Sequence, residues 1–372
     1  MHEHATAEGR INLILKRKFL ITAFILIELF YTASIQSCFF SAGQAPGEIT
    51  EDSRLMLDTV VSIRLYGSGN KKNLENAFRL IDKYENQLST TVENSDIYRI
   101  NSSTAGKPVK VSEDTIYLLE KSIEFAELSN GLFNPAVGPL VKLWGIGTEN
   151  AGVPGKNEIT EALKYINYKD ILIDRDSCEV TLRQEGMSID LGGIAKGWIA
   201  GKVSEFLVSA GEKHFLINLG GNIAAYGGKP EKSGTSDFRI GVQDPFGDRG
   251  NYIGIIPVNT DSIVSSGIYE RFFIYNGKKY HHILNTETGY PVENSLAGVT
   301  VVSGNATDAD ALSTTLFAMG LEKGRAFIES WNNINNTDSQ VKAVFITKNH
   351  EIYYAGGKGF MEITQTGNYT EK

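Results

Sequence analysis

Residues 187–197 contain groups suited to binding a phosphate. An expected strand, residues 187–190, ends at the carboxylate of Asp190, and two glycines lead into an expected helix at residues 193–209. A helix N-terminus has unpaired N–H groups and a positive potential, which favour an anion. The same residues also fit a tight turn that Asp190 only caps. Taken alone, this stretch leaves both interpretations open.

Residues 306–319 (ATDADALSTTLFAM) contain groups suited to binding a cation. In the helix expected at residues 308–319, Asp310 and Thr314 share one face because they are four residues apart. A carboxylate and a hydroxyl are hard oxygen ligands of the kind that Mg²⁺ takes, together with waters and substrate phosphates. Alternatively, Asp310 complements the helix dipole and Thr314 bonds back to a carbonyl.

Two of the six histidines in the chain, His281 and His282, are adjacent. In an extended segment, neighbouring side chains point to opposite faces, so one ring can face a site while the other packs. A histidine with the ordinary pKa of about 6.5 could accept a proton from a hydroxyl at neutral pH. A histidine with a purely structural role is the alternative.

The elements that must position these residues are short strands interspersed with helices. Other strands are expected at residues 55–66, 171–173, 179–182, 215–219, 238–242, 252–258, 272–275 and 299–303. Other helices are expected at residues 73–88 and 321–331, and between a cap at Ser112 and a stop at residues 130–131. This order lacks a regular βαβ alternation, so it predicts an α+β fold with a mixed sheet, as one catalytic unit with one or two lobes.

Composition excludes one class of partner. The 372 residues carry a net charge of −8, and their positive charges are scattered through the body of the chain. Proteins that bind nucleic acid normally have a basic excess or a basic stripe. We therefore expect no nucleic-acid partner.

The N-terminus has the layout of an export signal. Basic residues 16–18 precede an apolar run at residues 19–33, and Cys38 follows shortly after. The run is shorter than the roughly 20 residues that span a bilayer. It resembles a lipoprotein signal, in which Cys38 becomes the lipidated first residue. An uncleaved anchor helix is the alternative, and either one places the globular part outside the cytoplasm.

These features divide the chain into three parts. Residues 1–37 form the expected signal peptide, residues 38–53 the lipidated Cys38 with a flexible tether, and residues 54–372 the catalytic domain. The product would be anchored through lipid to a membrane, on the periplasmic side or at the cell surface. With Cys38 lipidated, Cys178 has no partner for an internal disulfide, and we expect it to be an inert core thiol in a strand at residues 177–182.

The order of the motifs resembles the ApbE family of FAD:protein FMN transferases. The motifs are residues 57–59, 88–90, 95–101, 131–140, 190–197, 218–222, 265–267, 281–283, 288–291 and 309–314. The resemblance covers residues 55–354. It implies a mixed-sheet, T-fold-like catalytic unit in which FAD lies in a cleft with Mg²⁺ at its pyrophosphate.

The resemblance also implies roles for individual residues. Asp310, Thr314 and the carbonyl of Gly193 match the metal ligands, and His282 matches the histidine near the reacting phosphate. The positions that contact FAD are Leu57, Thr91, Leu132, Phe133, Asn134, Asp190, Lys196 and Ile283. The implied reaction transfers FMN from FAD to a Thr or Ser hydroxyl of a client protein and releases AMP. An FAD pyrophosphatase and a non-catalytic flavin-binding lipoprotein are the alternatives.

The chain departs from the family pattern at three positions. Asn134 and Ile268 stand where family members often have Asp, so the first loses a charge and the second loses the polar group. Thr91 stands where some members have Tyr and others Asn. A larger side chain there could stack on the ligand, so Thr91 bears on how tightly FAD is held and whether water competes as the nucleophile.

Overall fold

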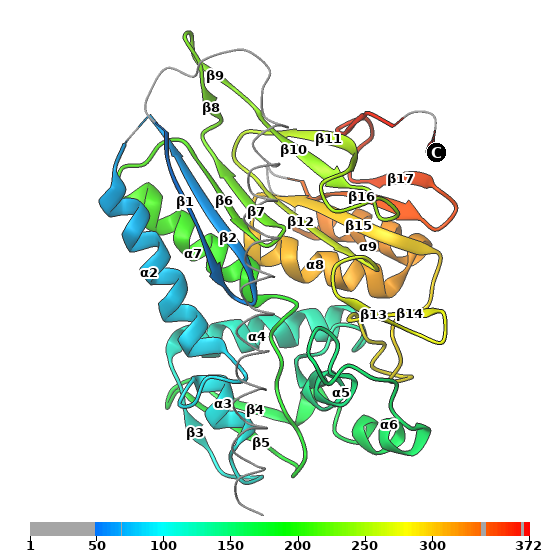
Figure 1. The fold of residues 1–372 in the computed structure, drawn as a ribbon. Helices are drawn as coiled ribbons and strands as arrows, with labels where there is room; N and C mark the ends of the chain where they lie inside the picture. Colours follow the sequence, from blue (N-terminus) through cyan, green and yellow to red (C-terminus); the bar gives the residue numbers. More distant parts are fainter. Residues whose placement is uncertain (1–48, 68, 336–339, 366–367) are drawn as a thin grey trace, which may run out of the picture. The chain divides into compact units, whose positions relative to one another are not determined.

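A large mixed sheet organises the described part of the chain (Figure 1). The computed structural model describes residues 49–67, 69–335, 340–365 and 368–372, which belong to one compact unit. Within them, nine strands form the sheet in the order β1 (Ile49–Met56), β2 (Thr59–Tyr66), β6 (Phe215–Leu219), β7 (Asn222–Tyr226), β12 (Ser262–Gly267), β15 (Leu296–Ser303), β16 (Lys342–Thr347), β17 (Glu351–Ala355) and β19 (Thr370–Glu371). All neighbours are antiparallel except β17 and β19, which are parallel. The α+β, mixed-sheet prediction is confirmed.

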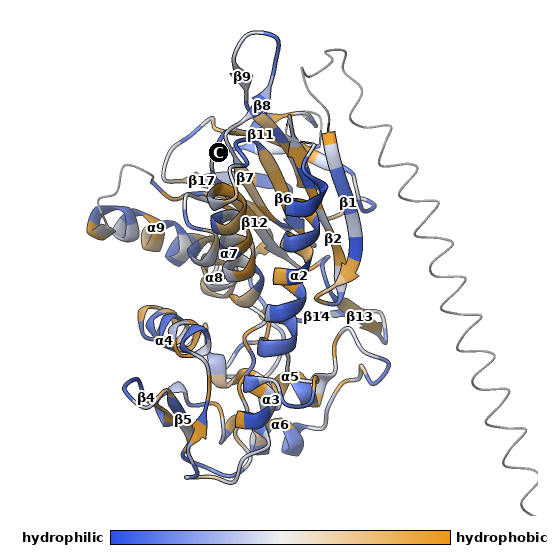
Figure 2. Cartoon of the chain, turned by 90° about the vertical axis from the view of Figure 1, so that its left-hand side faces the viewer, coloured by the Kyte–Doolittle hydropathy of each residue, from blue (hydrophilic) through white to orange (hydrophobic). Residues whose placement is uncertain are grey.

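Each face of the sheet has its own hydrophobic core. Helices pack on one face: α2 (Lys71–Leu88), α7 (Ala195–Ser209), α8 (Ala306–Met319) and α9 (Leu321–Asn335). The opposite face is covered by β10 (Phe238–Gln243), β11 (Tyr252–Val258) and β18 (Glu362–Ile363). Successive residues of a strand face opposite sides of the sheet. Val301 therefore packs in the core under the helices, and Val302 packs in the core on the opposite face. All of β15 is consequently buried, and Figure 2 shows the hydrophobic strands inside the layers.

A smaller group of elements lies below the sheet and its helices in Figure 1. Its helices are α3 (Asp96–Asn101), α4 (Glu113–Leu128), α5 (Gly138–Trp144) and α6 (Lys156–Leu163), and its strands are β3 (Val109–Lys110), β4 (Ile171–Asp174) and β5 (Glu179–Leu182). The hairpin of β13 (Phe272–Tyr275) and β14 (Lys278–His281) packs on it through Phe273 and Tyr280, whose rings lie near Trp144. Beyond the sheet, β8 (Lys229–Pro230) and β9 (Thr235–Ser236) form a separate hairpin.

Two segments differ from their predicted structure. Residues 55–66 are not one strand, because Leu57 and Asp58, both with φ 54°, form a turn between β1 and β2. Neither is a glycine, so the turn lacks its usual signal. Residues 49–53, which were expected in the flexible tether, form the first part of β1. Residues 187–190 join no ladder, because Ile189 N donates to the side chain of Asn101 (2.6 Å) and Asp190 N donates to the carbonyl of Pro135 (2.9 Å).

Cys178 is not a core strand residue. With φ 53°, it lies in the turn between β4 and β5 and is half-buried. Its Sγ lies 3.6 Å from the carbonyl oxygen of Arg175.

Cys38, the expected signal peptide and residues 38–48 of the expected tether lie outside the described residues. Across the described ranges, no helix combines the length and apolarity needed to cross a membrane.

Candidate functional site

The backbones of α7 and α8 touch where the site begins. A Cβ added at Gly197 would lie 2.3 Å from the carbonyl oxygen of Ala306 and 2.5 Å from Asp310 Cβ, so only glycine fits. At this contact, the N–H of Gly197 donates to Asp310 Oδ2 at 2.8 Å. It is one of the N–H groups that the first turn of α7 leaves unpaired, so the Asp310 carboxylate also caps α7.

The Asp310 carboxylate is buried among positive and donor groups. Its side chain is 4% exposed, and burial raises its pKa. The positive charge of Lys196, the N–H of Gly197 and a hydrogen bond from the Asn222 side chain oppose that rise. A carboxylate held this deeply is stabilised by a cation beside it.

The turn before α7 packs against the same face of α8. A Cβ added at Gly193 would lie 3.4 Å from Thr314 Oγ1 and 3.0 Å from the Phe133 ring. Asp310, Thr314 and the backbone of Gly193, which come from two distant parts of the chain, therefore meet in one place. The described residues contain no cluster of three or more His, Cys, Asp or Glu that could hold a metal. One carboxylate with neutral hard oxygens fits Mg²⁺, which completes its shell with water and substrate phosphates.

His282 directly follows β14 and lies near this cluster. Burial lowers its pKa to about 4, and the positive charges of Arg271 and Lys196 lower it too, against a hydrogen bond to Arg271. Its Nδ1 lies 3.3 Å from the carbonyl oxygen of Arg271. A proton on Nδ1 donates to that oxygen and leaves Nε2 as a free acceptor. The ring is neutral at pH 7 and is in the form that accepts a proton.

His281 points the other way, as an extended segment requires. It is 5% exposed, and its Nε2 lies 2.9 Å from the carbonyl oxygen of Val292. Its ring packs edge-on against Phe317. Of the two adjacent histidines, His281 is the packed one and His282 the partly exposed one.

Asp190 caps its own turn. Its Oδ1 accepts from the N–H of Gly192 at 2.8 Å, as the structural interpretation of residues 187–197 requires. Burial raises the pKa of Asp190, against the nearby positive charge of Arg271. The positive charge of Arg271 also lowers the pKa of His282, so it acts on both the turn and the histidine.

The remaining residues near the turn are held by their own contacts. Asn134 is buried, and its Oδ1 accepts from the N–H of Ala136 at 2.9 Å. Leu132 is half-buried and precedes Phe133, the ring beside Gly193. Ile283 is buried with its side chain in the core on the helical side of the sheet, and its carbonyl accepts from Val292 N at 2.9 Å.

Leu57 and Thr91 form a separate group at the C-terminal end of α2. The N–H of Leu57 donates to Glu85 Oε1 at 2.9 Å, and the exposed Thr91 bonds to Ser89, with Oγ1 3.1 Å from Ser89 Oγ. Among the described residues, their hydrogen bonds reach none of the groups around Asp310.

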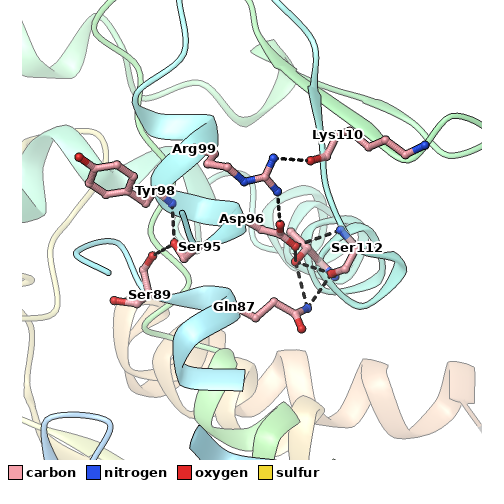
Figure 3. A network of polar contacts seen from close by, with 9 residues as sticks. Gln87, Ser89, Ser95, Asp96, Tyr98, Arg99, Lys110 and Ser112 are labelled. Atoms are coloured by element: carbon pink, nitrogen blue, oxygen red, sulfur yellow. Dashed lines mark hydrogen bonds and ion pairs between the residues drawn. The ribbon is translucent and has the colours of Figure 1, made fainter. Parts of the chain in front are cut away.

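A polar network fixes the segment that carries Thr91 (Figure 3). Ser95 Oγ donates to the carbonyl of Ser89 at 2.5 Å. Asp96 accepts from Ser112 N at 3.0 Å and from Thr115 Oγ1 at 2.7 Å, and it pairs with Arg99. The network ties the end of α2 to α3 and to the start of α4.

Sequence reasoning missed three residues of the site. Asn222 was named only within the motif at residues 218–222, and Arg271 and Glu85 were not expected to have a role. A polar residue at a strand end or on a helix gives no local sign of the distant group that it contacts, so no signal in the sequence singles them out.

Comparisons with known proteins show the family of the chain. Residues 57–337 match the model of the ApbE family. A protein of Klebsiella pneumoniae (strain 342) named FAD:protein FMN transferase is 36% identical over 81% of this chain and 90% of its own. A protein of the same name from Treponema pallidum (strain Nichols) is 34% identical over 76% of this chain and 82% of its own.

Solved structures have the same fold. The crystal structure of the ApbE protein of Thermotoga maritima covers 86% of this chain and 98% of its own, with 32% identity and a TM-score of 0.73. The flavin transferase ApbE of Vibrio cholerae covers 83% and 98%, with 28% identity and a TM-score of 0.73. The matched family model spans the turn, α8 and the histidine pair described above, and the chain belongs to the ApbE family.

Proposed function

We propose that this chain is a Mg²⁺-dependent FAD:protein FMN transferase that attaches FMN from FAD to a Thr or Ser hydroxyl of a client protein. The observation that carries the proposal is the meeting of Asp310 and Thr314 on α8 with the Gly193 turn before α7. Family membership and the names of the relatives support the reaction type.

The residues present fit a magnesium site. Asp310, Thr314 and the Gly193 carbonyl would hold the ion, which when bound neutralises charge on the pyrophosphate oxygens. Lys196 adds a fixed positive charge beside Asp310 and His282. The site therefore concentrates positive charge where a dinucleotide's phosphates would lie, as phosphoryl transfer requires.

His282 supplies the proton acceptor. The client's hydroxyl oxygen attacks the FMN-side phosphorus, the bond from that phosphorus to the bridging oxygen breaks, and AMP leaves with that oxygen. The hydroxyl proton passes to the neutral Nε2 of His282, which the Nδ1–Arg271 contact orients. His282 needs no prior deprotonation at neutral pH, because its pKa is about 4.

The test is an assay of client flavinylation. The protein is incubated with FAD, Mg²⁺ and a flavoprotein client fragment, with and without EDTA. We expect flavin fluorescence that survives denaturing electrophoresis on the client, only when Mg²⁺ is available. Free FMN and AMP without labelled client would indicate an FAD pyrophosphatase. FAD that stays bound and unchanged with Mg²⁺ present would indicate a flavin-binding lipoprotein without turnover.

We also propose that the protein is exported and held to a membrane by lipid on Cys38, with its domain on the periplasmic side or at the cell surface. The basic and apolar segments before Cys38 support this location. Cys38→Ser should move the protein from the membrane fraction to the soluble fraction and abolish labelling with radioactive palmitate. Unchanged labelling would contradict the anchor.

A further inference from the structure

Asn222, the first residue of β7, lies against the Asp310 carboxylate. Its side chain is 3% exposed and hydrogen-bonds to Asp310. An ionised carboxylate can only accept hydrogen bonds, so the Nδ2–H of Asn222 is the donor in its bond to Asp310. β7 lies inside the sheet between β6 and β12, so the amide stands on a rigid element.

The other end of this amide is unsatisfied. Asn222 Oδ1 is buried and has no hydrogen-bond partner among the described residues. A buried acceptor without a donor costs about 1–3 kcal/mol, so such groups normally have a partner. The adjacent Asp310 carboxylate cannot supply one, since it is itself an acceptor. The donor must therefore come from outside the described residues, as a water or as part of a ligand.

A hydrated cation brings donors of the required kind. Mg²⁺ usually keeps several waters, and their O–H groups donate to nearby protein oxygens. We propose that Asn222 is a positioning residue of the cation site: its Nδ2 holds the Asp310 carboxylate and its Oδ1 accepts from a water on the ion. This inference rests on the proposed function, because it takes the cation at Asp310 as given.

Direct metal binding tests the role without relying on turnover. Mn²⁺ serves as the probe, because the electron paramagnetic resonance signal of the free ion reports the fraction bound. Titrations with Mn²⁺ alone are run on the wild-type protein, Asn222→Ala and Asn222→Leu. Both substitutions should weaken Mn²⁺ binding by about 10–100-fold, the usual effect of losing such a partner. The Mg²⁺ concentration for half-maximal transfer should rise by a similar factor.

Asn222→Leu separates positioning from packing. Leucine fills a similar volume and removes the unpaired acceptor, so this variant should fold even where alanine leaves a cavity. If Asn222 only fills space, Asn222→Leu would bind Mn²⁺ like the wild type, and the inference would be overturned.

Asn73→Ala is the matched control. Asn73 is also a buried asparagine that donates to a carboxylate, Glu212 Oε1 at 2.7 Å, but it lies on α2. Its loss should leave Mn²⁺ affinity unchanged. Mn²⁺ binding that is absent in the wild type would contradict the metal site of the proposed function itself. Binding that is present in the wild type and equal in both Asn222 variants would contradict only the role of Asn222.

Discussion

The predicted site residues lie in two regions, the junction of α7 and α8 and the end of α2. The two regions hold their residues by different kinds of contact. At the junction, residues more than 100 positions apart meet through buried backbone, as in the bond from Gly197 to Asp310. At the end of α2, the exposed Thr91 is held by Ser89, two residues away.

This difference indicates separate roles for the two regions. A buried carboxylate that both caps a helix and faces a lysine tolerates little change, because each partner depends on the others. An exposed threonine on a locally bonded turn can vary without disturbing the core. We infer that the junction performs the chemistry and the end of α2 adjusts the affinity for FAD.

The largest effect is expected from Asp310→Ala. Removing the carboxylate takes away the only charged oxygen of the proposed ion site and uncaps the Gly197 N–H. Transfer should fall by about 10³-fold or more, as when a charge-neutralising group is lost from phosphoryl transfer. The measurement is the rate of client labelling by gel fluorescence at saturating FAD.

Asp310→Asn separates charge from capping. The amide oxygen can still accept from Gly197 N, so the thermal unfolding midpoint should stay close to the wild-type value while transfer is lost. Full transfer by this variant would remove the metal assignment.

Local signals in the sequence predicted much of the fold. Ser112 caps α4 as expected, by accepting from Thr115 N at 3.1 Å, and Asn130 and Gly131, with φ of 53° and 83°, end that helix. These features depend on neighbouring residues, so the sequence shows them directly. The hairpin at Leu57 was missed because its turn has no glycine, and the unpaired segment 187–190 was missed because its backbone bonds to the distant residues Asn101 and Pro135.

In the site, too, the sequence predicted the features that depend on neighbouring residues and missed those that depend on distant ones. Spacing on one helix placed Asp310 and Thr314 together, and strand alternation separated His281 from His282. The resemblance to a family supplied their roles. Nothing local shows that Asn222 Oδ1 is left without a donor or that the charge of Arg271 acts on both Asp190 and His282. Those relations exist only once distant segments pack.

The next effect is expected from His282→Ala. Loss of a proton acceptor should lower transfer by about 10²–10⁴-fold.

In the wild type, kcat/KM should fall as pH decreases through about 4, because protonation there removes the neutral ring. Bound FAD adds negative charge that favours the protonated ring, so the acid limb of kcat should lie at higher pH. If His282→Ala keeps the same acid limb of kcat/KM as the wild type, that limb belongs to another group.

A smaller effect is expected from Gly197→Ala, which tests the close contact at the junction. The added Cβ meets the backbone carbonyl of Ala306, so α7 and α8 must move apart. Stability should fall by about 1–3 kcal/mol, the usual cost of overpacking, and transfer should fall by about tenfold or more, since a misplaced group loses alignment. Denaturant unfolding and the labelling assay measure the two effects.

Gly201→Ala is the control on the same helix. A Cβ added there would lie 3.8 Å from Ala306 Cβ, an ordinary contact. Alanine is favoured over glycine in a helix by about 1 kcal/mol, so stability should hold or rise and transfer should be unchanged. Equal losses in both variants would show that the contact at Gly197 has no special role.

The smallest effect is expected at the end of α2, from Thr91→Tyr. A tyrosine on this exposed turn can stack on a ring of FAD, and such a contact contributes about 0.5–1.5 kcal/mol. The FAD concentration for half-maximal transfer should therefore fall by at most about tenfold, while the maximal rate stays the same.

Thr91→Ala removes only the bond between the hydroxyls of Thr91 and Ser89, because Ser89 Oγ still accepts from the N–H groups of residues 91 and 92. It should leave both quantities nearly unchanged. A change in maximal rate without a change in half-saturation would place Thr91 in the chemistry and remove the distinction between the two regions.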